Sequence, residues 1–306
     1  MRALLALCAA LTLLVSACTG ADLSGTRLRI AAGSSGGVYF QLAQPLAAAW
    51  SAELGSDRPE VQQTGGSPDN LARLRAGTAD VAFTAADVAA TSTGRPELLA
   101  LARIHDDYLH VVVRADSGIT TLDGLRGRTV AIGAAESGVA VIAQQLLGVV
   151  GLDAPGSLTV RHIELGESLD ALRHGQIDAL FWSGGLPTGA ITALANQVPL
   201  RLVDIGAAMS AMRSANPAYR SATIPRSTYP QAGGPVTTLA VPNFLVVPAT
   251  MGADLAEALT RGLFAARPEL AKVNPAALSI DARPAIETTP MPLHPGALRY
   301  YRSLKE

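Results

Sequence analysis

The chain has 306 residues, of which 49% are hydrophobic and 16% are charged. This length is enough for two globular lobes that each bury a core of their own. The 24 Lys and Arg residues are balanced by 25 Asp and Glu residues, and they form no basic runs. Nucleic-acid binding requires clustered Lys and Arg, so the composition excludes that class of function.

Residues 1–20 have the pattern of a secretory signal, with one basic residue, an apolar core and small residues before Cys18. The apolar core is too short for a membrane-spanning helix, which needs roughly 20 residues. The string from Leu14 to Cys18, LVSAC, resembles a bacterial lipobox, in which cleavage leaves a lipid-bearing cysteine. We expect a signal peptide over 1–18, a lipid on Cys18 and a tether over 19–27. An ordinary cleavage site that contains a cysteine is the alternative.

Strand-like and helix-like segments alternate from residue 28 onward, and the alternation starts again near residue 128. We expect strands at 28–32, 61–63, 79–83, 98–104, 109–113, 128–133, 158–163, 179–182 and 200–203, and helices at 40–50, 70–76, 85–91, 139–149, 167–174, 188–197 and 252–266. This order favours parallel sheets with helices on both faces, and the restart marks a second lobe.

The β-branched, apolar segment from Val236 to Val247 is expected to carry the chain back to the first lobe. Pro242 then has to lie at a bend or an edge, because proline cannot donate to a sheet. We expect lobe 1 to comprise 28–113 and 238–306, and lobe 2 to comprise 114–237. Two α/β lobes joined by crossing strands form a clamshell with its ligand site in the crevice between them.

Three turns rich in small residues each lead from an expected strand into an expected helix. They read GSSGGVY at 33–39, TGGSPDNL at 64–71 and GAAESGVA at 133–140. The first N–H groups of a helix have no partner within the helix, and the positive end of the helix dipole lies behind them. Each turn is therefore a candidate anion site, and together the three can hold one small acidic molecule.

Four motifs in order resemble the solute receptors of TAXI-type TRAP transporters: IAAGSSGGVYFQLA, VQQTGGSPDNLARLRAGTADVAF, DGLRGRTVAIGAAESG and ALFWSGGLP. The likeness extends from about residue 28 to 268. It implies a two-lobed α/β clamshell of the type II periplasmic-binding-protein kind with a hinge of crossing strands. It also implies a monomeric, extracytoplasmic receptor that hands a small organic acid to an ion-driven membrane permease. Characterised relatives bind glutamate, glutamine or 2-oxoglutarate-like compounds.

The resemblance also implies which residues contact the ligand. They are Ser34, Gly36, Gly37, Val38, Tyr39, Thr64, Gly66, Ser67, Asn70, Asp87, Ser137, Gly138, Val139, Trp182 and Gly185. The third turn departs from the usual glycine, serine, glycine, threonine of the family, because it reads Glu136, Ser137, Gly138, Val139. A carboxylate and the loss of a hydroxyl there are expected to weaken the binding of an acidic group.

No cofactor or metal is expected, since the five His residues are scattered and none are four residues apart. His105, Asp106 and Asp107 are expected in a solvated loop. The glycine-rich turns also have a purely structural interpretation: glycines permit a tight turn, and Ser67 followed by Pro68 is typical of a helix N-cap.

Three other functions remain open at this stage. The chain fits a receptor for an ATP-driven importer, or a ligand sensor that presents its closed form to a signalling partner. Gly33 to Gly37 also matches the G-x-S-x-G pattern of a serine hydrolase, with Ser35 as the nucleophile. Against the hydrolase, this strand is the first of its domain, whereas the hydrolase elbow follows several earlier strands.

Overall fold

The computed structural model describes residues 21–305. The expected signal peptide and the lipid-bearing Cys18 therefore lie outside the described residues. Between residues 21 and 305, every helix is either too short or too polar to cross a membrane.

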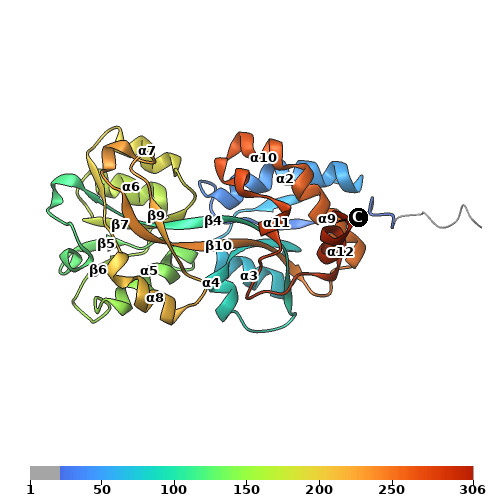
Figure 1. Cartoon of the computed structure of the whole chain (residues 1–306), viewed down its shortest axis with the longest axis horizontal. Coiled ribbons are helices and arrows are strands. Elements are labelled where there is room, and N and C mark those ends of the chain that lie inside the picture. Colours follow the sequence, from blue (N-terminus) through green and yellow to red (C-terminus); the bar gives the residue numbers. More distant parts are fainter. Residues whose placement is uncertain (1–20, 306) are drawn as a thin grey trace, which may run out of the picture.

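Lobe 1 is built around a small parallel sheet with helices on both faces (Figure 1). Its elements are β1 (Arg29–Ala31), α2 (Val38–Leu54), β2 (Glu60–Gln62), α3 (Ser67–Ala76), β3 (Val81–Ala85), α4 (Ala86–Thr91), α9 (Ala253–Ala265), α10 (Arg267–Val273), α11 (Ala282–Ala285) and α12 (Pro295–Ser303). Strand β1 pairs in parallel with both β2 and β3. Helix α2 buries Leu42, Leu46 and Trp50, four residues apart, and ends at Gly55 in the left-handed conformation.

Lobe 2 repeats this arrangement with its own parallel strands and helices (Figure 1). Its elements are β5 (Thr129–Ala131), α5 (Gly138–Val149), β6 (Thr159–Arg161), α6 (Leu165–Arg173), β7 (Ala179–Gly184), α7 (Gly189–Ala195), β8 (Leu200–Leu202), α8 (Met209–Ala215) and β9 (Arg220–Ile224). Strand β5 pairs in parallel with β6 and β7. The sequence predicted most of these elements, but it assigned no helix or strand between residues 203 and 236, where α8 and β9 lie.

Two long antiparallel strands, β4 (Leu98–Arg114) and β10 (Val236–Pro248), run through both lobes and join their strands into one sheet (Figure 1). They pair with each other from Ala240 opposite Tyr108 to Pro248 opposite Leu98. We call this pair of strands the hinge ribbon. The expected lobe boundaries at 113 and 238 fall near the ends of these shared strands, so the division into two ranges remains a prediction.

The expected solvated loop at 105–107 does not exist, because these residues lie inside β4. His105 and Asp107 are buried, and His105 Nε2 lies 3.1 Å from Asp107 Oδ1. Asp106 is held by Arg103 at 2.8 Å. The polar run suggested a break in the strand, but these side chains find partners within the protein, which lets the backbone continue as one strand.

Pro242 lies where one side of β10 has no neighbouring strand. Strand β9 pairs with β10 up to Ala240, and β3 pairs with it only from Asn243 onward. The register with β4 also shifts between Asn243 and Phe244. The prediction of a local edge or bend at Pro242 is therefore confirmed, and its missing N–H leaves no gap in a ladder on that side.

Candidate functional site

A cavity of about 90 Å³ lies between the two lobes, next to the hinge ribbon. Its wall is formed by Ala32, Gly33, Ser34, Gly37, Val38, Tyr39, Gly65, Gly66, Ser67, Ala85, Asp107, Ser137, Gly138, Val139, Ile142, Trp182, Ser183 and Gly184. This volume is well above the roughly 10–15 Å³ that holds one water molecule, so the cavity has room for a small ligand.

The three glycine-rich turns bring three helix N-termini to this cavity. Helices α2, α3 and α5 begin after Gly37, Gly66 and Ser137, and all three of these residues line the wall. Gly66 has φ of 120°, a backbone conformation that other residues rarely adopt. Ser137 caps α5 by accepting a hydrogen bond from the Ala140 N–H at 3.2 Å. The combined helix dipoles make this side of the cavity favourable for an anion.

The two lobes touch each other across the cavity, so the structure is a closed form. A Cβ atom on Gly65 of lobe 1 would lie 3.5 Å from the carbonyl oxygen of Glu136 in lobe 2, and one on Gly66 would lie 3.6 Å from the Gly138 nitrogen. Asp87 of α4 also reaches lobe 2, where Tyr219 donates to its Oδ2 at 2.9 Å. Such contacts are lost when the lobes separate, so they contribute to closure.

Tyr39 and Ser67 form a connected pair on the lobe 1 wall. The Tyr39 hydroxyl donates to Asn243 Oδ1 on the hinge ribbon, and it lies 3.4 Å from Ser67 Oγ. Burial, followed by the nearby Asp107 carboxylate, raises the pKa of Tyr39 well above its usual value, so this phenol stays protonated. Ser67 Oγ accepts from the Ala85 N–H at 3.0 Å. Ser67 is not the N-cap that the sequence suggested, because Gly66 occupies that position.

Thr64 and Asn70 lie behind the wall and support it. The Thr64 hydroxyl accepts from the Gly33 N–H at 2.7 Å and donates to Asn70 Oδ1. Asn70 in turn donates to the Phe83 carbonyl oxygen at 2.8 Å. These bonds tie the first two turns to β3 and occupy both side chains. Their role in this structure is to position the turns.

Ten of the fifteen residues expected at the ligand line the cavity. They are Ser34, Gly37, Val38, Tyr39, Gly66, Ser67, Ser137, Gly138, Val139 and Trp182. The other five lie elsewhere: Thr64 and Asn70 behind the wall, Asp87 at the lobe contact, Gly36 exposed on the first turn, and Gly185 beside a neighbouring cleft of about 350 Å³. Whether the ten bind a ligand remains a prediction.

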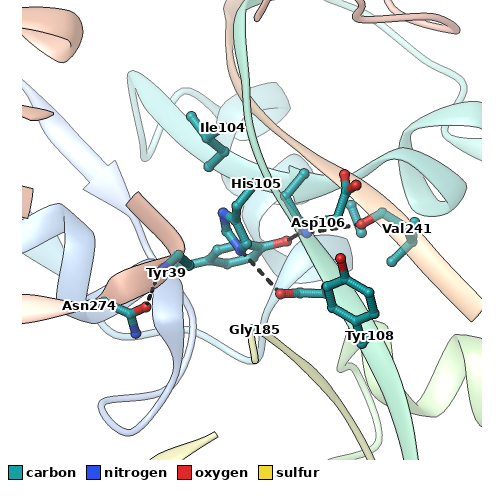
Figure 2. Close-up of polar contacts among 12 residues, drawn as sticks. Tyr39, Ile104, His105, Asp106, Tyr108, Gly185, Val241 and Asn274 are labelled. Carbon is teal, nitrogen blue, oxygen red and sulfur yellow. Dashed lines mark hydrogen bonds and ion pairs between the residues drawn. The ribbon is translucent and has the colours of Figure 1, made fainter. Parts of the chain in front are cut away.

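Asp107 is the most informative wall residue that sequence reasoning missed. It comes from the hinge ribbon, and its side chain is 12% exposed. Its partner His105 packs edge-on against Tyr39, with ring centroids 6.0 Å apart, and Figure 2 shows these two side chains together. The signal in the sequence was the alternation of His105 and Asp107, which places both on one face of a strand.

Of the described residues that line the cavity, Asp107 is the one with a carboxylate, and none is Lys, Arg or His. Glu136, which was expected to disturb an acidic ligand, is exposed and lies outside the wall. Val139 does line the cavity, together with Ile142. The third turn therefore contributes backbone groups and apolar contacts, while the buried negative charge comes from the hinge ribbon.

The other chemical alternatives find little support in the geometry. Ser35, the nucleophile of the hydrolase alternative, is exposed and is not part of the cavity wall. His110 is fully buried, and its Nε2 lies 3.0 Å from the Tyr229 hydroxyl. Burial lowers the pKa of His110 to about 4, so it is neutral near pH 7. Within residues 21–305, no group of three His, Cys, Asp or Glu side chains is placed to hold a metal.

Comparison with solved structures gives the same fold. MatC from Rhodopseudomonas palustris, with bound malate, has a TM-score of 0.56 at 14% identity and covers 82% of this chain and 89% of its own. The alkanesulfonate-binding protein SsuA from Xanthomonas axonopodis pv. citri, bound to MOPS, has a TM-score of 0.53 at 15% identity, covering 91% and 84%. A putative L-cystine ABC transporter protein from Listeria monocytogenes has a TM-score of 0.51 at 13% identity, covering 81% and 94%.

These likenesses establish the α/β fold of type II periplasmic binding proteins, which the sequence predicted. Residues 30–303 match the NMT1-like family, and this range includes the cavity, the hinge ribbon and both lobes. The chain therefore belongs to the NMT1-like family, a family of extracytoplasmic solute-binding proteins that serve membrane transporters.

Proposed function

We propose that this protein is the receptor of a TAXI-type TRAP transporter, which captures a small organic acid and delivers it to an ion-driven permease. The observation that carries the proposal is the meeting of three of the four TAXI-like motifs at one interlobe cavity, each through the start of a helix. The fourth motif supplies Trp182 to the same wall. Motifs far apart in the sequence thus share one site.

The ligand's acidic group would bind to backbone N–H groups and hydroxyls at the N-termini of α2, α3 and α5. This mode needs no buried arginine, in keeping with the absence of basic side chains from the described wall. Glutamate, glutamine or 2-oxoglutarate-like compounds are the ligands we propose for this cavity. Cys18 would carry the lipid that holds the receptor at the membrane, with residues 19–27 as its tether.

A receptor for an ATP-driven importer is the second candidate. It is favoured by the names of two proteins that share the fold, an alkanesulfonate-binding protein and a putative L-cystine ABC transporter protein. Both candidates predict ligand capture in the same cavity. They differ in the permease and in the energy that drives uptake.

Binding is tested by thermal unfolding of the purified protein with a panel of amino acids, dicarboxylates, oxo acids and sulfonates. A ligand at 100 times its Kd adds about 2.7 kcal/mol to the stability, which is readily seen as a shift of the midpoint. A ligand found in this way is then used in uptake by cells that express the receptor with its permease. Loss of uptake on collapse of ion gradients at constant ATP supports the TRAP assignment, and loss on ATP depletion with gradients maintained supports the importer.

A further inference from the structure

The cavity wall combines two different electrical environments. Three helix N-termini line it, and a negative group is stabilised beside them. The hinge ribbon contributes Asp107 to the same wall. Since none of the described wall residues is Lys, Arg or His, no side chain of the wall itself neutralises this carboxylate.

His105 is the hydrogen-bond partner of Asp107. Its Nε2–H donates to Asp107 Oδ1 at 3.1 Å. Its Nδ1 is buried and, among the described residues, has no hydrogen-bond partner. Among residues 21–305, His105 is thus the one side chain that donates a hydrogen bond to Asp107 at the cavity wall.

A buried carboxylate that receives a single hydrogen bond from the protein has unused acceptor positions. The Tyr39 hydroxyl lies nearby, but it donates to Asn243 Oδ1, so Asp107 has no second donor within residues 21–305. A ligand that fills the cavity without supplying a donor would remove water from this carboxylate and leave the charge uncompensated, which is costly. A ligand with an ammonium group would replace the lost water by a charge-assisted hydrogen bond.

We propose that Asp107 binds the ammonium group of the ligand, so that this receptor selects an amino acid over the hydroxy or oxo acid of the same carbon skeleton. The proposal rests on the receptor function given above and names its substrate class. The ligand's carboxylate lies at the helix N-termini and its ammonium group lies at the hinge ribbon. Succinate, malate and 2-oxoglutarate are excluded as the preferred ligands because none has an ammonium group.

The test uses wild-type protein and isothermal titration calorimetry. Succinate, L-malate and L-aspartate share a four-carbon skeleton with two carboxylates and differ at C2 by hydrogen, hydroxyl or ammonium. L-Glutamate with 2-oxoglutarate, and L-alanine with pyruvate, give two further pairs. We expect the amino acid of the preferred skeleton to bind at least about 10-fold more tightly than its counterparts, the factor expected for one hydrogen bond between charged groups.

Asp107→Asn is expected to remove most of this preference while retaining binding of the carboxylate. Asp106→Asn is the matched control, because Asp106 is the adjacent carboxylate, is paired with Arg103 and does not line the cavity. Its preference for the amino acid should equal that of the wild type. If Asp107→Asn fails to fold, the affinities of the wild-type protein for the matched ligands still test the proposal.

Equal or tighter binding of a hydroxy or oxo acid overturns the role of Asp107 and leaves the receptor function standing. An amino-acid preference that survives Asp107→Asn in a folded protein also overturns it. If no amino acid, hydroxy acid or oxo acid binds at all, the proposed TAXI-type receptor for an organic acid fails, and the substrate class fails with it.

Discussion

Asp87 should make the folding stability depend on pH in a direction opposite to that of most carboxylates. It lies at the lobe contact, 1% exposed, where Tyr219 donates to it. Burial raises the pKa of Asp87 from 3.8 to about 6, with a smaller contribution from the Asp107 charge. Because the folded value is the higher one, the group stabilises the fold fully below the unfolded pKa near 4. That contribution is lost as the pH rises through about 6.

The size of the effect follows from the two pKa values. A difference from 3.8 to about 6 corresponds to about 3 kcal/mol at 1.36 kcal/mol per pKa unit. Asp87→Asn removes the titration and keeps an oxygen that can accept from Tyr219. We therefore expect the free energy of unfolding of the wild type, minus that of Asp87→Asn, to fall by about 2 kcal/mol between pH 4 and pH 7.5, because the remainder of the change occurs below pH 4.

The assay is urea unfolding of both proteins at a series of pH values, without ligand. Using the difference cancels the titration of all other groups, which the two proteins share. Tyr219→Phe is an internal check: it removes a hydrogen bond that lowers the pKa of Asp87, so the midpoint of the pH transition should move upward. A difference that stays constant within about 0.5 kcal/mol from pH 4 to pH 7.5 would refute the argument.

Three further outcomes are expected. Gly185→Val should weaken ligand binding about tenfold or more, because even a Cβ at this position lies 3.3 Å from Ala276 Cβ of the opposite lobe. Small-angle scattering should then show no compaction of this variant when ligand is added. Gly189→Ala is the control for Gly185→Val, because a Cβ on Gly189 has no heavy atom within 4 Å. Normal closure of Gly185→Val would contradict the reasoning. Ser67→Ala should lower the stability of the ligand-free protein by about 1–3 kcal/mol, since the buried Ala85 N–H loses its acceptor, whereas exposed Ser35→Ala should leave it unchanged. The His110 ring should remain neutral down to about pH 4 in NMR titration, and titration near pH 6.5 would show that it is solvated.

The two-lobed fold could be predicted from the sequence because the signals for it lie in short, local stretches of the chain. Alternating strands and helices, and the restart near residue 128, follow from periodicity and from turn residues such as Gly55 and Gly77, both left-handed helix ends in the structure. The long strand β4 was harder, because His105, Asp106 and Asp107 look like a polar break. A strand through these residues is stable only because the folded protein supplies hydrogen-bond and ion-pair partners for their side chains.

The site was predicted in part for a similar reason. The glycine-rich turns carry their own signal, and Gly37, Gly66 and Ser137 do stand before helices at the cavity. Thr64 and Asn70 belong to the same motif, but their hydrogen bonds turn them inward, which no motif can reveal. Asp107 reaches the cavity through the path of β4, about 40 residues beyond the turn that supplies Ser67. Such a residue is found only when the topology is known.

The hinge ribbon has a consequence for exchange of amide hydrogens. Strands β4 and β10 stay paired along the length that joins the lobes, from Ala240 opposite Tyr108 onward. A change in the angle between the lobes can therefore bend this ladder without breaking its bonds, and the ribbon amides should exchange slowly in both empty and loaded protein. The amides at the starts of α2 and α3 have no such partners among residues 21–305, and they should become protected only on loading. Hydrogen exchange measured by mass spectrometry would thus distinguish the hinge ribbon, which bends, from the helix starts that are proposed to bind the ligand.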